Sequence, residues 1–518
     1  MSSSATKDIP VEMETATSVT SDGFERGFRF WIVIAGLAIS TLLASLEHTV
    51  VTTPAPYILK DLDMKENYIR VTNAFFVCSG LCGGATIGEM LIAGRAIQGA
   101  GFGGIVLTVN IIVSDICPVR KRGQYMAMIL AVFGVGVALG PFVGGSIAEY
   151  SSWRLVFYIN IPIGGVSFIV MFIFLHVKYK DETSFTTKLR RIDIVGNTIL
   201  MTGTVAILYA LTYAGTTFAW SSWHTLVPLS LGFLSFGLFV VFEASGIAVE
   251  PVLPLRLFSD RTSIIVLINT FLNSTIYFWY LYFIPVYFQA VKLYSPSRAG
   301  YSLLPQALAG LPGAILAAVS LSKWGKFKVI HLVGFGLSTM GMGLLSMSNK
   351  HTSISEWAVF QMIVALGIGV IIDTLLPAFQ APVSEADQAA ATSAWSFIRA
   401  FGAIWGVAIP AVIFNNRINE NLHLVSNLSA RKLLKDGGAY EQASAVFVQQ
   451  FSVEVQDEMR ELYALALDRL FWIGAIFAGL GFLLVLIERD VPLRKTLETE
   501  FGLESNNQTA GSCDEKGK

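Results

Sequence analysis

The sequence predicts an all-α polytopic membrane protein, and three observations support this fold class. Of the 518 residues, 53% are hydrophobic and 14% are charged, with a mean hydropathy of +0.60. Uncharged runs of about twenty residues recur along the chain, each long enough to cross a bilayer as a helix. The basic residues gather in short clusters between these runs, and the net charge is only −1. This pattern orients spans in a lipid bilayer and indicates no nucleic-acid surface.

The two ends of the chain are polar. Residues 1–29 are rich in Ser and Thr and lack the apolar core of a signal peptide, so we expect a disordered cytoplasmic tail. Residues 488–518 are charged and polar, and we expect them on the same side. The four cysteines are too scattered for a disulfide framework, and Cys78 and Cys82 have no nearby histidine to complete a metal site. We therefore expect neither a metal nor a cofactor.

The first span, near Phe30 to Val51, carries an acid inside its apolar run. Glu47 could simply cap the helix end near the membrane interface. A carboxylate within the membrane is nevertheless by default a candidate for a proton relay or for substrate binding. We favour this functional role for Glu47.

The stretch 90–174 organises the rest of the chain, and its first span contains a charge among small and apolar residues. Arg95 there is expected to face a polar interior rather than lipid, so a polar region must run through the bundle. Gln98, nearly one turn later, shares the same helix face. The alternative for this pair is a hydrogen bond that joins two helices.

The second span of this stretch carries a run of glycines. Three of them recur at four-residue spacing on one helix face, where the missing side chains let a neighbouring helix approach closely. Pro141 lies among them and can kink the helix where the bundle must flex. Helix packing alone would explain an isolated glycine stripe. The run comprises Gly136, Gly140, Pro141, Gly144 and Gly145.

Together, these two patterns resemble motifs of the major facilitator superfamily. The segment with Arg95, Gln98 and Gly99 resembles its arginine motif, and the glycine-proline run resembles a motif of its antiporters. The following segment is similar to the signature of the fourteen-span drug:proton antiporter branch, and the residues around Glu47 resemble the first-helix motif of that branch. The signature residues are Trp153, Arg154, Asn160 and Pro162. The resemblance implies a major facilitator fold, with two pseudo-symmetric helical halves and two extra linking helices.

One region departs from the family pattern. The apolar part of residues 71–84 is only about a dozen residues long, which is short for a span. The resemblance implies helices two and three here, joined by a basic loop that this chain lacks. Later basic clusters, such as Arg120 to Arg122, all fall on the cytoplasmic side only if the segment does not cross the membrane. We therefore predict a re-entrant or interfacial piece with both ends outside.

The remaining pattern is regular and predicts twelve full spans with both termini in the cytoplasm. The external loop contains Asn427-Leu428-Ser429, a glycosylation acceptor that is usable only outside. The expected layout is an N-terminal half at 30–175, linking helices at 194–247, a C-terminal half at 263–414, an external loop at 415–469 and a last span at 471–487.

Further charges and aromatic residues lie in later spans. Asp373 interrupts an apolar span, where an acid can exchange protons; equally, it can form a structural salt bridge with Arg399 on the next helix. Both alternatives stay open. Glu243 lies near a span end, and we expect it to reach water. Aromatic residues crowd positions 271–283, and we expect most of them to form an interfacial belt, although some could line an apolar pocket.

No nucleotide-binding loop of the Gly-x-x-x-x-Gly-Lys-Ser/Thr type occurs, and no catalytic constellation is visible, so an ion-driven transporter is expected rather than an enzyme. The resemblance implies a proton-coupled antiporter that exports a hydrophobic toxin, secondary metabolite or drug. We expect a monomer in the cell membrane, with the vacuolar membrane as the alternative. Siderophores or basic amino acids are the alternative substrates. The rival hypothesis is a shortened, transport-inactive product of a transporter gene, from an alternative transcript or an incomplete gene prediction.

Overall fold

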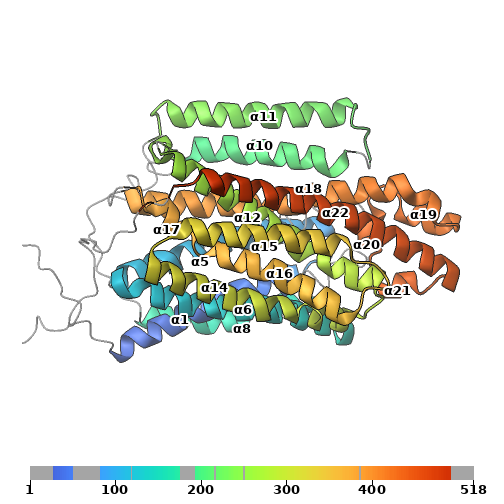
Figure 1. The fold of residues 1–518 in the computed structure, drawn as a ribbon, viewed down its shortest axis with the longest axis horizontal. Helices are drawn as coiled ribbons and strands as arrows, with labels where there is room; N and C mark the ends of the chain where they lie inside the picture. The colour runs from blue at the N-terminus through green and yellow to red at the C-terminus, as the bar shows by residue number, and fades with distance from the viewer. Residues whose placement is uncertain are drawn as a thin grey trace, which may run out of the picture.

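The computed structural model describes residues 27–50, 82–117, 119–174, 193–214, 217–248, 251–258, 260–383, 387–489 and 491. These residues form a bundle of long helices that run mainly along one direction (Figure 1). Among them, nine helices are long and apolar enough to cross a membrane. Two shorter apolar helices, Phe28–Leu43 and Leu155–Ser167, accompany these nine. The predicted all-α membrane fold is confirmed for the described residues.

The N-terminal half is built around its first helix. Its elements are α1 (Phe28–Val50), α5 (Gly88–Ile116), α6 (Val119–Tyr150), α7 (Leu155–Tyr158) and α8 (Asn160–Phe174). Helix α1 packs against α6, α8 and α5. It approaches α6 closely because Gly136 has no side chain: a Cβ there would overlap the hydroxyl of Ser45. Ser40 and Ser167 join α1 to α8 through their hydroxyls, 2.5 Å apart.

The two linking helices lie beside the bundle as a pair (Figure 1, top). They are α10 (Ile194–Tyr213) and α11 (Trp223–Ala244), and α10 contacts the bundle through α18. The expectation that Glu243 of α11 reaches water is wrong, because its side chain is buried. The chain turns back over the helix end, and the carboxylate accepts hydrogen bonds from the backbone amides of Val252 (3.2 Å) and Leu253 (3.4 Å).

The C-terminal half surrounds α12. Its elements are η1 (Leu255–Phe258), α12 (Arg261–Val286), the π-helix η2 (Tyr287–Val291), α13 (Pro296–Tyr301), α14 (Leu304–Trp324), α15 (Phe327–Ser346), α16 (Ile354–Ile372), α17 (Leu375–Gln380), α18 (Gln388–Asn421) and α22 (Val453–Ile487). Helix α12 packs against α16, α17, α18 and α22. The side chains of Trp279, Tyr280, Tyr282 and Phe283 are at most 2% exposed. The predicted interfacial belt is therefore wrong for these four residues, because neighbouring helices surround α12.

The region expected to be an external loop at 415–469 differs from that expectation. Helix α18 continues to Asn421, and α22 begins at Val453 rather than at 471. Between them lie η4 (Leu422–Leu424), α19 (Leu428–Leu434), α20 (Gly438–Glu441) and α21 (Ala445–Val448). We name residues 422–452 the cap; they lie beyond one end of the bundle (Figure 1, right).

The cap is fastened to the bundle by aromatic residues. The ring of Tyr440 lies 5.6 Å from that of Phe283, and the hydroxyl of Tyr463 donates to the carbonyl of Ala439 (2.7 Å). The hydroxyl of Tyr440 also donates to the carbonyl of Tyr282 in α12 (3.4 Å). The cap therefore belongs to the C-terminal half.

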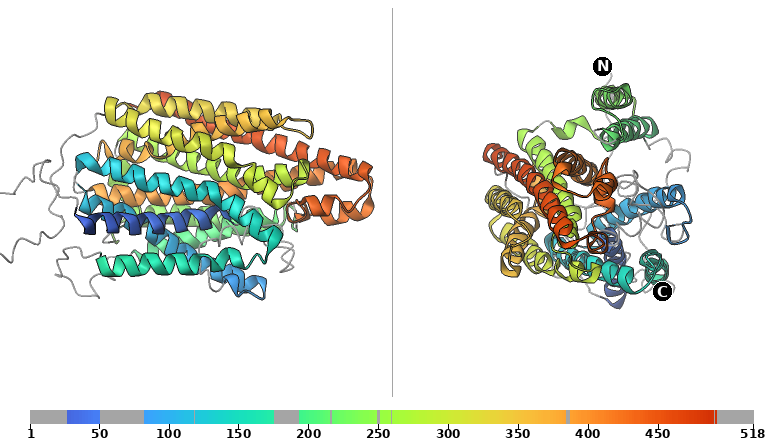
Figure 2. Two further views of the ribbon diagram at one scale, coloured as in Figure 1. Left: turned by 90° about the horizontal axis from the view of Figure 1, so that it is seen from below. Right: turned by 90° about the vertical axis from the view of Figure 1, so that its right-hand side faces the viewer.

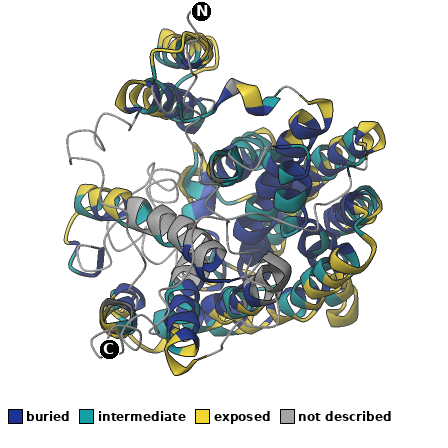
Figure 3. Cartoon of the chain, turned by 90° about the vertical axis from the view of Figure 1, so that its left-hand side faces the viewer, coloured by how far each residue is buried: buried dark blue, intermediate teal, exposed yellow. Residues whose placement is uncertain are grey.

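Exposed residues line the outside of the bundle and buried ones face its middle, as expected for helices surrounded by lipid (Figure 3). We name the end that carries the cap the cap end. The opposite end contains helix α17 and the turn between α14 and α15 (Figure 2). We name it the basic end, because Lys323, Lys326 and Lys328 lie at this turn. Residues 71–81 of the shortened segment and most of both tails lie outside the described residues. So does the side chain of Glu47, whose backbone lies in the last turn of α1.

Candidate functional site

The two halves meet most closely at the cap end, where α6 packs against α13 and α14. A Cβ on Gly145 of α6 would overlap the carbonyl of Pro296 in α13. In return, a Cβ on Gly300 of α13 would fall 2.5 Å from the carbonyl oxygen of Pro141. Backbone therefore meets backbone, and only glycine permits this approach. The glycine run thus serves two contacts, with Gly136 facing α1 and Gly145 facing the other half.

The hydrophobic core also differs between the two ends of the bundle. One cluster of buried residues joins Leu46, Trp153 and Phe157 of the N-terminal half to the C-terminal half. A second cluster, which includes Phe30 and Tyr125, contains only residues of the N-terminal half. Phe30 begins α1 and Tyr125 lies in the first turns of α6, at the end opposite the Gly145 contact. Within the described residues, the halves share a core toward the cap end and keep separate cores toward the basic end.

Arg95 lies where the halves share their core. Its side chain is fully buried, and its Nη1 donates to Oε1 of Gln98 (2.7 Å). The guanidinium carbon lies 4.6 Å from the ring centroid of Phe157, a cation–π distance. Arg95 also interacts electrostatically with Tyr282 of α12, in the other half. The expected pairing of Arg95 with Gln98 is present, and it places a buried cation at the interface between the halves.

The signature residues after α6 support the start of α5. The Nη2 of Arg154 donates to the carbonyl of Ala85 (2.9 Å), and the guanidinium carbon lies 4.4 Å from the ring centroid of Trp153. Asn160 is buried at the start of α8, whereas Pro162 is exposed on its first turn. Arg154 and Trp153 therefore position the segment that leads into Arg95, and their geometry indicates a structural role.

Asp373 and Arg399 lie in the C-terminal half. Asp373 stands at the break between α16 and α17, and it interacts electrostatically with Arg399 of α18. Among the ion pairs of the described residues, none within 4.0 Å joins these two side chains. The guanidinium carbon of Arg399 lies 5.3 Å from the ring centroid of Trp395, and Tyr277 of α12 is a further electrostatic neighbour. Asp373 and Arg399 are therefore electrostatic neighbours, but the direct salt bridge predicted as one alternative is not present between them.

The predicted charges thus form two groups rather than one. Arg95 interacts electrostatically with Tyr282, while Arg399 interacts with Asp373 and with Tyr277, which lies five residues before Tyr282 on the same helix. Sequence reasoning noted these tyrosines only as aromatic residues of a crowded span. The aromatic pattern gave no sign that Tyr277 and Tyr282 interact with charged residues of other helices. Helix α12 thus carries one electrostatic neighbour of each group.

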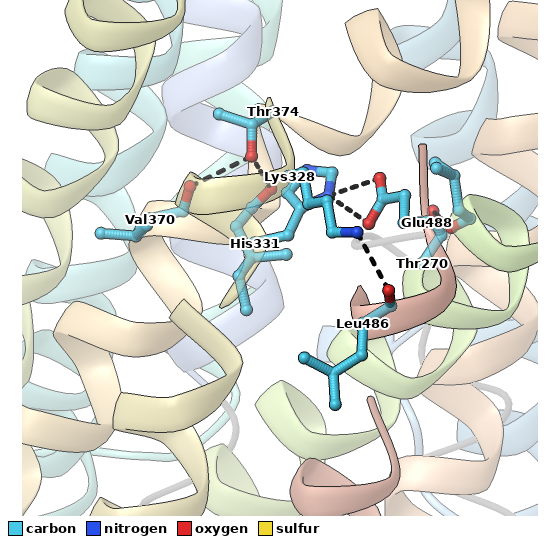
Figure 4. Close-up of polar contacts among 9 residues, drawn as sticks. Thr270, Lys328, His331, Val370, Thr374, Leu486 and Glu488 are labelled. Atoms are coloured by element: carbon cyan, nitrogen blue, oxygen red, sulfur yellow. Dashed lines mark hydrogen bonds and ion pairs between the residues drawn. The ribbon is translucent and has the colours of Figure 1, made fainter. Parts of the chain in front are cut away.

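A third buried polar cluster was not predicted. His331 of α15 and Glu488, which follows α22, both have fully buried side chains, and Nδ1 of His331 lies 2.9 and 3.1 Å from the two carboxylate oxygens (Figure 4). Beside them, Nζ of Lys328 donates to the carbonyl of Leu486 (2.9 Å). The cluster fastens the end of the last span to α15 at the basic end.

Comparison with known proteins places this fold in a family. Residues 35–407 match the Major Facilitator Superfamily. The chain belongs to this superfamily. It is therefore a multi-pass membrane transporter and not an enzyme, as the resemblance of its motifs implied.

Named relatives and a solved structure agree. The chain is 51% identical over 510 residues to the MFS-type transporter TwmF of Talaromyces wortmannii, covering 92% of this chain and 93% of that protein. It is 39% identical over 521 residues to the MFS efflux transporter aclA of Aspergillus oryzae, covering 94% of each. A bacterial homolog of the human lysosomal transporter Spinster has the same fold, with a TM-score of 0.57 and 15% identity over 90% of this chain and 99% of that one.

Proposed function

We propose that this transporter exports a hydrophobic small molecule in exchange for protons. The observation that carries the proposal is the placement of three charged residues around α12: Arg95 is fully buried at the interface of the halves, and the half-buried Asp373 and Arg399 are electrostatic neighbours in the second half. Buried ionisable groups in a membrane bundle are costly and mark substrate or proton paths. The name of the relative aclA, an efflux transporter, supports export rather than uptake.

The proposed proton carriers are Glu47 and Asp373. Glu47 lies in the last turn of α1, and Asp373 lies at a helix break with a cation nearby. A carboxyl group can carry a proton only if its surroundings differ between two states of the transporter. Arg95 would couple these states, because it lies at the contact between the moving halves.

The proposed cycle is a rocking of the halves about the site. We place the basic clusters in the cytoplasm, which puts the cap outside the cell, and we propose that the contact between α6 and α13 closes this outer end. Opening that end must separate Gly145 from α13. The linking helices and the cap then move with the C-terminal half, since α10 contacts α18 and the cap contacts α12 and α22.

We base the proposed substrate class on the kinds of residues that lie near these charges. Aromatic side chains of α12 accompany the charges, and such a site suits a flat, largely apolar molecule with few polar groups. We propose a secondary metabolite or toxin as substrate, with the siderophore and amino-acid classes as alternatives. We also propose a monomer in the cell membrane with both termini cytoplasmic.

The alternative proposal is that this chain is a shortened product of a transporter gene and does not transport. The short apolar run at 71–84 motivates it, and residues 71–81 lie outside the described part. The test is efflux of a panel of hydrophobic fluorescent dyes from transporter-deleted cells that express this chain. Export that is lost in Glu47→Gln at matched membrane levels supports the first proposal. Absence of export that is regained on inserting the missing helices and loop supports the second.

A further inference from the structure

The contact between the halves at the cap end includes one charged residue, Glu149, which the proposed function does not use. Glu149 lies in the last turn of α6, four residues after Gly145, so both residues share a helix face. Its Oε2 accepts a hydrogen bond from the backbone amide of Ser297, in the first turn of α13 (3.1 Å). The bond therefore joins the N-terminal half to the C-terminal half.

We propose that Glu149 is a latch that sets how often the transporter opens at the cap end. The inference rests on the proposed rocking of the halves, and it adds the residue that biases this movement. The Gly145 contact brings the two backbones together, since a Cβ there would lie 3.2 Å from the same Ser297 nitrogen. Glu149 then adds a hydrogen bond between α6 and α13 at the exposed edge of this contact.

The geometry makes the bond specific to one state. The carboxylate accepts a charge-assisted hydrogen bond, and its length of 3.1 Å requires α6 and α13 to remain in contact. When the halves separate at the cap end, the Ser297 amide loses this acceptor and the carboxylate is hydrated by water. The closed state is therefore favoured by the free energy of this hydrogen bond relative to that of the hydrated carboxylate. Because Glu149 is exposed at the rim, the gain is modest and acts on a population rather than on folding.

A matched carboxylate exists on the same side of the molecule. Glu356 accepts a hydrogen bond from the backbone amide of Ser353 (2.6 Å) at the start of α16. Both partners belong to the C-terminal half. Glu356→Gln therefore weakens a similar bond between a carboxylate and a backbone amide without touching the contact between the halves, and it serves as the control.

The test measures the distance between the halves by double electron–electron resonance of spin labels at Ser152→Cys and Val453→Cys, in nanodiscs. Both positions are exposed at the cap end, one in each half, and the native cysteines are replaced by alanine in all samples. Glu149→Gln is expected to raise the ratio of the long-distance to the short-distance population by roughly three- to tenfold. Glu356→Gln is expected to leave the distribution unchanged.

Glu149→Ala tests the same bond with the acceptor removed altogether, because the glutamine of Glu149→Gln keeps one oxygen that can still accept from the Ser297 amide. It should shift the populations in the same direction as Glu149→Gln. Distributions that match the parent in both variants would overturn the latch, as would an equal shift in Glu356→Gln. The experiment uses neither substrate nor a proton gradient, so its outcome is separate from the outcome of the export test.

Discussion

The buried pair of His331 and Glu488 leads to a quantitative prediction about stability. Both side chains are fully buried, and one imidazole nitrogen lies 2.9 and 3.1 Å from the two carboxylate oxygens. Replacing His331 by Leu leaves a buried carboxylate without this partner, and such a loss costs about 3–5 kcal/mol. Replacing Glu488 by Leu leaves the buried imidazole without its hydrogen-bond partner at Nδ1, so the expected cost is about 1–3 kcal/mol.

The double variant measures the coupling free energy between His331 and Glu488, apart from the cost of each single replacement. With both residues changed to Leu, no unpartnered polar group remains, and its free energy of unfolding should lie closer to that of the parent than the sum of the single costs predicts. We expect a coupling free energy of at least about 2 kcal/mol. Lys350→Met is the control, because its ion pair with Asp457 is partly exposed and should contribute less than about 1 kcal/mol.

The assay is unfolding in mixed micelles with increasing SDS, followed by tryptophan fluorescence and circular dichroism. The two signals must coincide for the free energies to be meaningful. Additive single costs, or a cost below about 1 kcal/mol for His331→Leu, would refute the argument that this pair is buried and mutually dependent.

Three further predictions concern transport and topology. Gly145→Val should force the halves apart at the cap end and lengthen the distance between spin labels at Ser152→Cys and Val453→Cys; an unchanged distance distribution at equal expression would contradict the close packing. Asp373→Asn should reduce proton-driven efflux by at least about tenfold while the protein still reaches the membrane, as for a residue that must release a proton; normal efflux with lowered stability would instead indicate a structural partner of Arg399. Asn427→Gln should remove a mass shift that is sensitive to endoglycosidase, and absence of such a shift in the parent would leave the cap side without its glycan marker.

The fold class could be predicted from hydropathy because a bilayer demands long apolar helices, and this demand is visible in the sequence. The lengths of α18 and α22 were not predicted, because hydropathy locates only the apolar part of a helix, whereas α18 continues to Asn421 and α22 begins at Val453. The short helices of the cap between them carry no apolar run that hydropathy could detect. The belt prediction failed for a related reason. Hydropathy shows that α12 suits an apolar environment, but it does not show whether lipid or other helices provide that environment.

The candidate site was predictable in its residues more than in its arrangement. The pairing of Arg95 with Gln98 follows from helical spacing alone. The separation of Asp373 from Arg399 depends on the rotation of two helices, which periodicity does not specify. The contact of His331 with Glu488 joins residues 157 apart in the chain, and no local pattern connects them.

The most direct test of the proposed function is export before and after the proton gradient is collapsed. Transporter-deleted cells that express this chain are loaded with a hydrophobic dye from the panel that they export, and the rate is followed by fluorescence. Export should stop when a protonophore removes the gradient, and the Glu47→Gln variant should show the same low rate with the gradient intact. Export that continues unchanged without the gradient, in parent and variant alike, would contradict proton-coupled antiport.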